Sequence, residues 1–358
     1  MKTLLFFESA AQSIPQSTAW YLADLGEYRG KQELYVRQAP QKLKALKEHA
    51  IIESAVSSNR IEGVTIDPSR VQEVVLGRAH LRDRDEEEVR GYRKALELIH
   101  TKFDTLALSE DNIRELHRLA RGGTGDAGKY KSRDSDIIER YPDGRVRIRF
   151  KTVPAKETSQ YMKLLIKAWQ DCINELWTHP LIALAAFNLD FLCVHPFRDG
   201  NGRVSRLLML LQCYQFGYEV GRYISLERII EDNKQRYYET LEESSKGWHE
   251  GKHDPWPYLN FVLFVLKTAY KEFEERAASI QSPRGSKTEM VHYAVLAVDR
   301  HFTVADIEKK CPAVSRDMIR TVLKTMQKNG VVECIGRGPG ALWKKVIPLK
   351  EGNKEGNK

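Results

Sequence analysis

The sequence predicts a mainly α-helical protein, in which a helical bundle carries one β-hairpin and is followed by a small winged-helix domain. Apolar residues recur at helical spacing through most of residues 1–280, and a single turn signal near residue 143 separates two β-like runs. Residues from 288 onward show three short helical patterns and then two strands around a glycine-rich tip. No stretch reaches 18 uncharged apolar residues, so we expect no membrane span.

Composition and charge narrow the class of protein. The 358 residues are enough for two or three domains, and the net charge of +8 is concentrated near one end. Residues 281–358 hold 15 of the 57 basic residues but only 8 of the 49 acidic ones. Five scattered cysteines without a CxxC pair indicate reduced thiols rather than a zinc site. Because the N-terminal apolar run is too short for a secretory signal, we expect a cytoplasmic protein.

The helical segments follow one another along the chain. The first ends near Gly63, and the second, 69–103, has charged outer faces. Ser109 is the N-cap candidate of the next helix, which stops before a Gly-Gly pair. Residues 181–194 are apolar almost all round, which predicts a central buried helix. Further helical patterns cover 157–177, 203–217, 237–248 and 256–280.

The segment 136–154 departs from the helical pattern. Pro142, Asp143 and Gly144 form a turn signal, and apolar residues alternate with arginines over 145–150. This pattern predicts a β-hairpin that projects from the helical body.

The stretch VHPFRDGNGRVSRLL, residues 194–208, places polar and charged groups between two strongly apolar helices. A helix N-terminus near Gly200 offers free amides and a partial positive charge, and glycines let a ligand approach the backbone closely. Arg203 and Arg206 add two guanidinium groups, so the combination predicts a polyphosphate site. Phe197, which alternates with the polar groups, is expected to plug the loop into the core.

Two residues before this helix could supply the chemistry. Asp199 would repel phosphate unless a Mg²⁺ ion bridges the carboxylate and the phosphates. His195 could accept a proton from an incoming hydroxyl group. Taken singly, each feature has an ordinary structural explanation: the histidine could cap a helix, the glycines could form a turn, and the arginines could be solvated. Buried together without a ligand or partner, however, these charges would cost several kcal/mol, which favours a site.

This stretch resembles the signature HxFx(D/E)GNGRxxR of the Fic-domain family. The defined positions are all present as His195, Phe197, Asp199, Gly200, Asn201, Gly202, Arg203 and Arg206. The resemblance covers roughly residues 90–280 and, more weakly, the N-terminal region. It implies a Fic-type helical bundle that transfers AMP from ATP to a Tyr, Thr or Ser hydroxyl of a protein, itself included. It implies His195 as the general base and Asp199 as the Mg²⁺ ligand. Position 202 is glycine rather than the lysine of phosphate-transferring relatives, which favours AMP transfer.

The resemblance also implies the rest of the site. The hairpin at about 135–150 resembles the family's flap, on which Ile137 and Ile138 would lie and which would pair with the target backbone as an added strand. The sequence YYETLEESS resembles the family's YYxTLExAN element near the nucleotide and indicates Tyr237, although Ser245 replaces the usual Asn. The implied ATP-binding residues are Gly200, Asn201, Gly202, Arg203, Val204, Ser205, Arg206 and Tyr237.

A second signal lies upstream, at the predicted helix end. Glu62 would lie in the last turn, where the helix dipole disfavours a negative charge by ~0.3–1 kcal/mol, so a positive partner is expected and Arg60 is a local candidate. An exposed glutamate is the ordinary alternative. Ser58 to Gly63 nevertheless resembles the family's inhibitory pattern (S/T)xxxE(G/N). That pattern implies that Glu62 pairs with Arg206 and blocks the γ-phosphate from its productive position.

The basic C-terminal region is expected to form a winged-helix-like module at 288–348, after a linker at 281–287 and before a low-complexity tail at 349–358. The helical pattern at 316–328 has one apolar face and a basic stripe that could cross DNA phosphates. A solvated face on a docking or dimerising module is the alternative. The basic stripe comprises Arg316, Arg320, Lys324 and Lys328.

The sequence therefore predicts an auto-inhibited protein adenylyltransferase that uses Mg-ATP. An N-terminal helical region, 1–90, would carry the inhibitory motif, and 91–280 would form the catalytic core. One alternative is a DNA-binding regulator whose helical body senses nucleotide, and another is a hydrolase that removes AMP from a modified target. The expected partners are ATP, a protein with a hydroxyl side chain, and DNA through 288–348; a homodimer is also open, because relatives in the family often dimerise.

Overall fold

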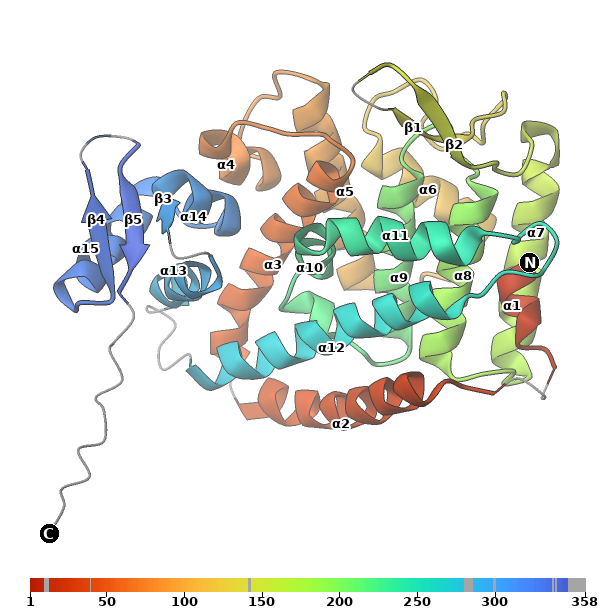
Figure 1. The fold of residues 1–358 in the computed structure, drawn as a ribbon, viewed down its shortest axis with the longest axis horizontal. Coiled ribbons are helices and arrows are strands. Elements are labelled where there is room, and N and C mark those ends of the chain that lie inside the picture. The colour runs from red at the N-terminus through yellow and green to blue at the C-terminus, as the bar shows by residue number, and fades with distance from the viewer. Residues whose placement is uncertain are drawn as a thin grey trace, which may run out of the picture. The chain divides into compact units, whose positions relative to one another are not determined.

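The computed structural model describes residues 1–9, 13–38, 40–140, 143–279, 286–298, 301–336, 338 and 340–346. Pro142 of the expected turn, residues 281–285 of the expected linker and the expected tail at 349–358 lie outside the described residues. The chain divides into two compact units, Met1–Ala278 and Ser279–Lys358. The first unit is helical apart from one hairpin, in the part of the chain that is described (Figure 1). No helix among the described residues is long and apolar enough to cross a bilayer.

The elements of the first unit are, in chain order, α1 (Lys2–Phe6), α2 (Gln16–Gln38), α3 (Pro40–Ile61), η1 (Pro68–Arg70), α4 (Val71–Val75), α5 (Arg84–Lys102), α6 (Glu110–Ala120), β1 (Ile137–Arg140), β2 (Val146–Phe150), α7 (Ala155–Asn174), α8 (Pro180–Val194), α9 (Asn201–Gln215), η2 (Val220–Arg222), α10 (Leu226–Asp232), α11 (Lys234–Ser245) and α12 (Trp256–Ser279).

Helix α8 forms the centre of this unit. Every residue of α8 after the first is buried, as its apolar sequence predicts, and α1, α7 and α9 pack against it. Its two polar side chains are satisfied inside the core. Asp190 accepts hydrogen bonds from the backbone N–H groups of Thr3 and Leu4, and Asn188 donates to the Ser205 carbonyl at 2.6 Å. The orientation of α8 against α9 is therefore fixed by polar contacts as well as by packing.

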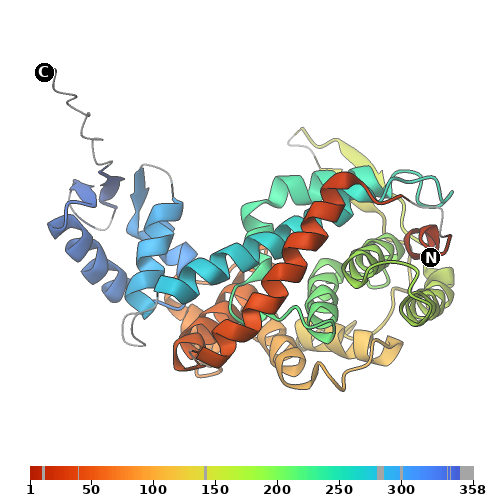
Figure 2. The ribbon, with the colours of Figure 1, turned by 90° about the horizontal axis from the view of Figure 1, so that it is seen from below.

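Helices α2 and α12 lie along one another at one side of the unit (Figures 1 and 2). The Thr18 hydroxyl donates to the Asn260 side-chain oxygen at 2.7 Å, and the rings of Tyr28 and Tyr270 stack with their centroids 5.6 Å apart. These contacts attach the N-terminal part of the chain to the helical body.

The continuous helical region predicted over 69–103 is interrupted in the structure. Gly77 adopts a φ of +78° just after α4, and Asp83 begins α5 by accepting a hydrogen bond from the Glu86 N–H at 2.9 Å. A left-handed glycine and an N-cap aspartate are ordinary helix boundaries. The run of charged residues around them concealed both signals. The predicted N-cap of α6 is confirmed, since Ser109 Oγ accepts from the Asn112 N–H at 3.3 Å.

The expected hairpin is formed by β1 and β2, which pair antiparallel at the edge of the unit above α11 (Figure 1). Ile138 pairs with Ile148, and the register shifts between Ile137 and Ile138. Both members of the Ile138–Ile148 pair are exposed. The hairpin therefore presents apolar side chains to solvent instead of burying them.

The second unit contains three helices and a three-stranded antiparallel sheet of order β3-β5-β4 among its described residues. The third strand, β3, was not expected, because three residues are too few to show an alternating pattern. Of the predicted apolar face of α15, Ile319, Val322, Leu323 and Met326 are buried and pack inward, whereas Met318 is half-buried. The elements are α13 (Ser286–Ala297), β3 (His301–Thr303), α14 (Val304–Lys310), α15 (Arg316–Lys328), β4 (Val332–Ile335) and β5 (Leu342–Lys345).

Candidate active site

The loop between α8 and α9 has a defined conformation. His195 ends α8 with a left-handed φ of +52°, and Gly200 precedes α9 with a φ of +84°. The Asn201 side chain closes the loop, because it accepts from the Phe197 N–H at 2.9 Å and donates to the Phe197 carbonyl at 2.7 Å. Phe197 is buried, as expected, and its ring stacks on the ring of His117 with the two centroids 3.7 Å apart. The loop is thus held from inside by an amide and an aromatic ring.

His195 lies in an environment that favours its neutral form. Its Nδ1 lies 3.3 Å from the Leu192 carbonyl, which can only accept, so Nδ1 carries the hydrogen and Nε2 keeps its lone pair. Burial, and then the positive charge of Lys131, lower the pKa of His195 to about 4, against the opposing carboxylates of Glu62 and Asp199. The imidazole is therefore neutral at pH 7, with a basic nitrogen available.

A cleft of about 470 Å³ lies beside this loop. It is lined by the histidine, by Gly202 in the first turn of α9, by both strands of the hairpin and by the buried tyrosine of α11. Of the residues predicted for the site, those that line it are Glu62, Ile137, Ile138, His195, Gly202 and Tyr237. Ser245, at the position where the family has Asn, also lines the cleft and donates to the Glu242 carbonyl at 3.2 Å.

The first turn of α9 presents its backbone rather than its side chains to the cleft. Val204 points into the core, and the Ser205 hydroxyl donates to the Gly202 carbonyl at 2.8 Å. A Cβ atom at Gly200 would come within 3.0 Å of the Arg121 side chain, and glycine suits its left-handed φ. This turn can therefore offer backbone amides to an anion at close range.

Arg206 and Glu62 form an ion pair across the site. Arg206 Nη2 donates to Glu62 Oε1 at 2.8 Å and to the Ser58 carbonyl at 2.9 Å, and its Nε donates to Ser58 Oγ at 2.9 Å. Burial opposes the charge of Arg206, but the carboxylate of Glu62 raises the pKa of the guanidinium above its ordinary value. Arg60, the local candidate partner of Glu62, lies 3.9 Å from Glu231.

The Glu62 carboxylate also reaches the N-terminus of α9. A Cβ atom placed on Gly202 would lie 2.2 Å from Glu62 Oε1, so the carboxylate rests directly on this residue. A negative group therefore occupies the place in the first turn where an anionic ligand would be attracted.

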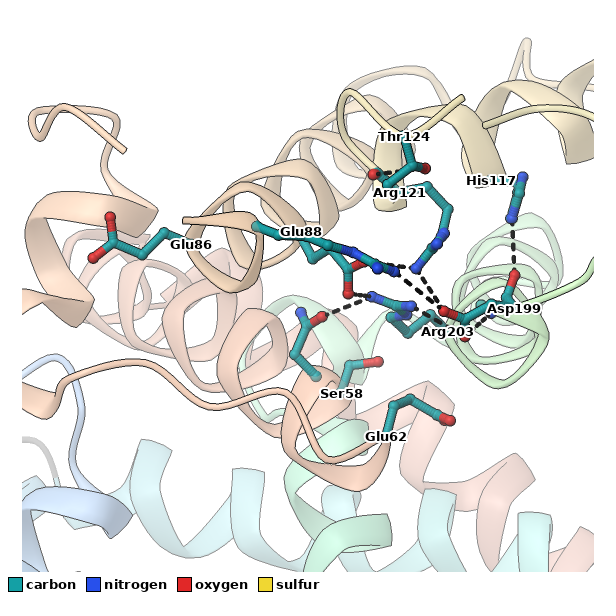
Figure 3. A network of polar contacts seen from close by, with 12 residues as sticks. Ser58, Glu62, Glu86, Glu88, His117, Arg121, Thr124, Asp199 and Arg203 are labelled. Carbon is teal, nitrogen blue, oxygen red and sulfur yellow. Dashed lines mark hydrogen bonds and ion pairs between the residues drawn. The ribbon is translucent and has the colours of Figure 1, made fainter. Parts of the chain in front are cut away.

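Arg203 lies in a separate network, which Figure 3 shows. Its Nη1 donates to Glu88 and, at 3.2 Å, to Asn59, while Asp199 lies 3.6 Å from Nη2. Arg121 Nη1 bridges Glu88 at 2.6 Å and Asp199 at 2.7 Å. Glu88 is thus buried and contacts the guanidinium groups of Arg203 and Arg121, which are buried, and that of Arg84, which is exposed. Arg121 also contacts the Asp199 carboxylate, which precedes α9.

His117 supports the same loop from α6. Its Nδ1 accepts from the Gly128 N–H at 2.8 Å, so Nε2 carries the hydrogen that it donates to the Asp199 carbonyl at 3.0 Å. The charged run around Glu88 and the single His117 and Arg121 in a helical pattern gave no sign of this role. These supporting residues, with Asn59, were missed by sequence reasoning.

The residues present fit a magnesium ion held together with a ligand. Within the described parts of the chain, no three His, Cys, Asp or Glu side chains group as a metal site. Asp199 is half exposed, with its side chain 50% accessible, so its carboxylate can be reached from solvent. Mg²⁺ commonly binds through one or two carboxylates together with substrate phosphates and water, which a single exposed aspartate satisfies.

His195 ends a buried helix and lies beside the N-terminus of α9, which also carries the buried Arg206. An arrangement of this kind offers backbone amides to an anion and an unprotonated imidazole nitrogen to a proton donor. Residues 107–213 match the family model described as the Fic/DOC family.

Curated relatives are named protein adenylyltransferase Fic. The chain is similar to the one from Nematostella vectensis, 25% identical over 228 residues that cover 61% of this chain and 47% of that protein. It is also similar to the one from Drosophila willistoni, 23% identical over 236 residues that cover 63% of this chain and 42% of that protein. The matches thus span less than half the length of these relatives.

Solved structures share the fold. A Fic family protein from Desulfovibrio desulfuricans G20 aligns with a TM-score of 0.61 and 23% identity, over 94% of this chain and 98% of that one. A Fic domain containing signaling protein from Bacteroides thetaiotaomicron aligns with a TM-score of 0.60 and 22% identity, over 73% of this chain and 98% of that one. The helical Fic-type fold predicted from the sequence is confirmed.

Proposed function

We propose that this protein is an auto-inhibited protein adenylyltransferase, which transfers AMP from ATP to a Tyr, Thr or Ser hydroxyl of a target protein, itself included. The observation that carries the proposal is the neutral His195 beside the first turn of α9 in one cleft. The names of the curated relatives, each an adenylyltransferase, support it.

In the proposed reaction the target hydroxyl oxygen attacks the α-phosphorus of ATP. His195 Nε2 takes the hydroxyl proton, a P–O bond to the target forms, and the P–O bond to the leaving pyrophosphate breaks. The backbone amides at the start of α9 bind phosphate oxygens and hold the α-phosphorus near the base. Arg206 would add a charged donor once it is released from Glu62. A nucleophilic hydroxyl must thus come within hydrogen-bonding distance of His195.

Asp199 would hold Mg²⁺ in this proposal. The ion, when bound, would neutralise phosphate charge and so favour departure of pyrophosphate. Arg121 and His117 keep the aspartate and its backbone in place, through the 2.7 Å and 3.0 Å contacts described above.

Glu62 would act as the inhibitor. Its carboxylate occupies Arg206 and the first turn of α9, so a phosphate group and Glu62 compete for the same guanidinium and the same amides. The flap would bind the target as an added strand, with Ile137 and Ile138 close to the cleft.

The direct test uses ATP labelled at the α-phosphate with the full chain in its Glu62→Gly form. Label should appear on protein and should be lost when His195→Ala is added. A nucleotide-sensing body without catalysis would bind ATP but transfer no label in either form. The third alternative, a hydrolase that removes AMP from a modified target, would release labelled AMP from protein that had been labelled beforehand. The same labelled protein therefore tests this alternative as well.

For the C-terminal unit, we propose binding to duplex DNA through α15. Lys324 and Lys328 are exposed on this helix, as is Arg320, which lies 3.4 Å from Asp317. Arg316 is half-buried and lies 3.6 Å from Glu308. The exposed lysines therefore offer the clearest phosphate contacts, and the acid-paired arginines offer fewer.

A further inference from the structure

A buried lysine lies behind the histidine. Lys131 is 5% exposed and stands between α6 and the flap. Its backbone N–H donates to the Pro196 carbonyl at 2.8 Å, and its Nζ lies 3.3 Å from the Val194 carbonyl and 2.7 Å from Thr152 Oγ1. One residue thus contacts the carbonyl before His195 and the carbonyl after it.

His195 needs such support. It is a non-glycine residue with φ +52° and ψ +60°, a left-handed conformation that costs roughly 1–2 kcal/mol for an ordinary side chain. Contacts that fix the carbonyls on both sides keep the backbone in this conformation. They therefore also fix the direction in which the imidazole leaves the end of α8.

We propose that Lys131 is a positioning residue for the transfer reaction, which holds His195 in its left-handed conformation and keeps a positive charge beside the imidazole. This inference rests on the proposed function. It assigns to Lys131 no contact with the nucleotide or with the target hydroxyl.

The charge of Lys131 acts on the histidine directly. After burial, Lys131 is the largest cause that lowers the pKa of His195, while the Leu192 carbonyl, Glu62 and Asp199 act in the opposite direction. Burial lowers the pKa of Lys131 itself to about 8, and Asp134 and Asp136 oppose this change. Lys131 is thus still largely protonated at pH 7 and fully so in the range where His195 titrates.

The same ammonium group also connects the histidine to the flap. Thr152 Oγ1 accepts from Lys131 Nζ and donates to the Ser135 carbonyl at 2.9 Å, and the Thr152 N–H donates to Asp136 Oδ1 at 3.2 Å. Ser135 and Thr152 flank the two strands of the hairpin. The base of the flap and the backbone around His195 therefore share one cation.

The test compares Lys131→Met with Lys131→Arg, both in the Glu62→Gly background of the full chain. The imidazole pKa of His195 is measured by NMR titration, and label transfer from α-labelled ATP gives the rate. Lys131→Met should raise the imidazole pKa by about one unit, because it removes a nearby buried charge. It should also lower kcat on the order of 10–100-fold, as the histidine loses its fixed position. Lys131→Arg should retain the low pKa.

Lys151→Met is the matched control, because Lys151 is exposed near the same hairpin and its loss should change neither readout. If Lys131→Met does not fold, Lys131→Gln replaces it, since it removes the charge but keeps a polar group for Thr152. An unchanged imidazole pKa in the neutral variant would overturn the proposal, even if activity falls. The titration needs no turnover, so absence of label transfer in the Glu62→Gly parent would instead count against the proposed function alone.

Discussion

Glu62 Oε1 lies 2.8 Å from Arg206 Nη2, although 144 positions separate the two residues in the chain. One end of this pair follows the last residue of α3, and the other lies on the second turn of α9. Because the same carboxylate rests on Gly202, the pair joins the C-terminal end of α3 to the helix N-terminus that would bind phosphate under the proposed function. The proposed activity and its inhibition thus depend on one short region.

Glu62→Gly should raise the rate of AMP transfer. The variant frees Arg206 and the first turn of α9, and a coupling of 1–3 kcal/mol corresponds to roughly a 5–150-fold gain. The rate of label transfer and self-modification, at saturating Mg-ATP, measures it. Glu48→Gln, at an exposed position on the same helix, is the control and should behave as the unmodified chain. Equal rates for Glu62→Gly and the unmodified protein would exclude inhibition by Glu62.

The pH dependence of transfer should follow the neutral form of His195. A base whose pKa is about 4 is already deprotonated at pH 6–8, so the rate should be flat there and fall only as the pH drops toward 4. His195→Ala should lower the rate by about 10²–10⁴-fold at every pH in this range. The measurement is a pH profile of kcat in the Glu62→Gly form. A fall of kcat centred near pH 6.5, which is about the ordinary pKa of histidine, would contradict the buried environment assigned to His195.

Glu88→Ala should destabilise the protein strongly. It removes the acceptor shared by the buried guanidiniums of Arg203 and Arg121, and an uncompensated buried charge costs about 3–5 kcal/mol. The free energy of unfolding, from denaturant titration followed by circular dichroism, checks this. Glu87→Ala changes the exposed neighbour on the same helix and should cost far less. Similar losses for the two variants would show that the Glu88 network contributes little.

Asp199→Asn should lower the apparent affinity of the enzyme for Mg²⁺. Loss of the carboxylate charge should raise the Mg²⁺ concentration at half-maximal rate by about tenfold or more, equivalent to about 1.4 kcal/mol. Chelation with EDTA should abolish transfer, and added Mg²⁺ should restore it. Asp126→Asn, which changes another carboxylate near Arg121, is the control. An unshifted Mg²⁺ curve for Asp199→Asn would remove this residue from the metal site.

Duplex DNA should bind the full chain at low salt and dissociate as salt rises. If α15 contacts phosphates, Lys324→Gln together with Lys328→Gln should reduce the slope of log K against log salt by about 2. Fluorescence anisotropy with a labelled duplex gives the slope. Absence of binding at the lowest salt concentration would leave the C-terminal unit as a docking module.

Much of the fold could be predicted because its signals are local. The almost entirely apolar sequence of α8 predicted burial, and the turn signal at 142–144 beside alternating residues predicted a hairpin. The break before α5 was overlooked, since a glycine and an N-cap aspartate stand inside a charged run that reads as helix. The short β3 could not be predicted, because its three residues gain their strand conformation from pairing with β5.

The residues of the site likewise differ in whether their role could be predicted from local sequence. His195, Gly200 and Gly202 follow from a helix end and a close backbone approach, which residue types reveal. Glu88 could not be recognised, because it is one of three successive glutamates. Glu86 and Glu88 are both buried, and which of them contacts Arg203 depends on how α5 packs against α9. The partner of Glu62 also depends on tertiary packing. Sequence proximity suggested Arg60, whereas the family resemblance implied Arg206, which is the partner in the structure.

Glu62 stands immediately after α3, in a turn closed by backbone hydrogen bonds from Glu62 and Val64 to the Asn59 carbonyl and from Gly63 to the Arg60 carbonyl. Helix termini open far more easily than helix interiors. Ser58, one turn earlier, is fully buried and stays with the body of the helix. Under the proposed function, fraying of this single turn would therefore be enough to move Glu62 away from Arg206 and relieve the inhibition, without any rearrangement of the surrounding bundle.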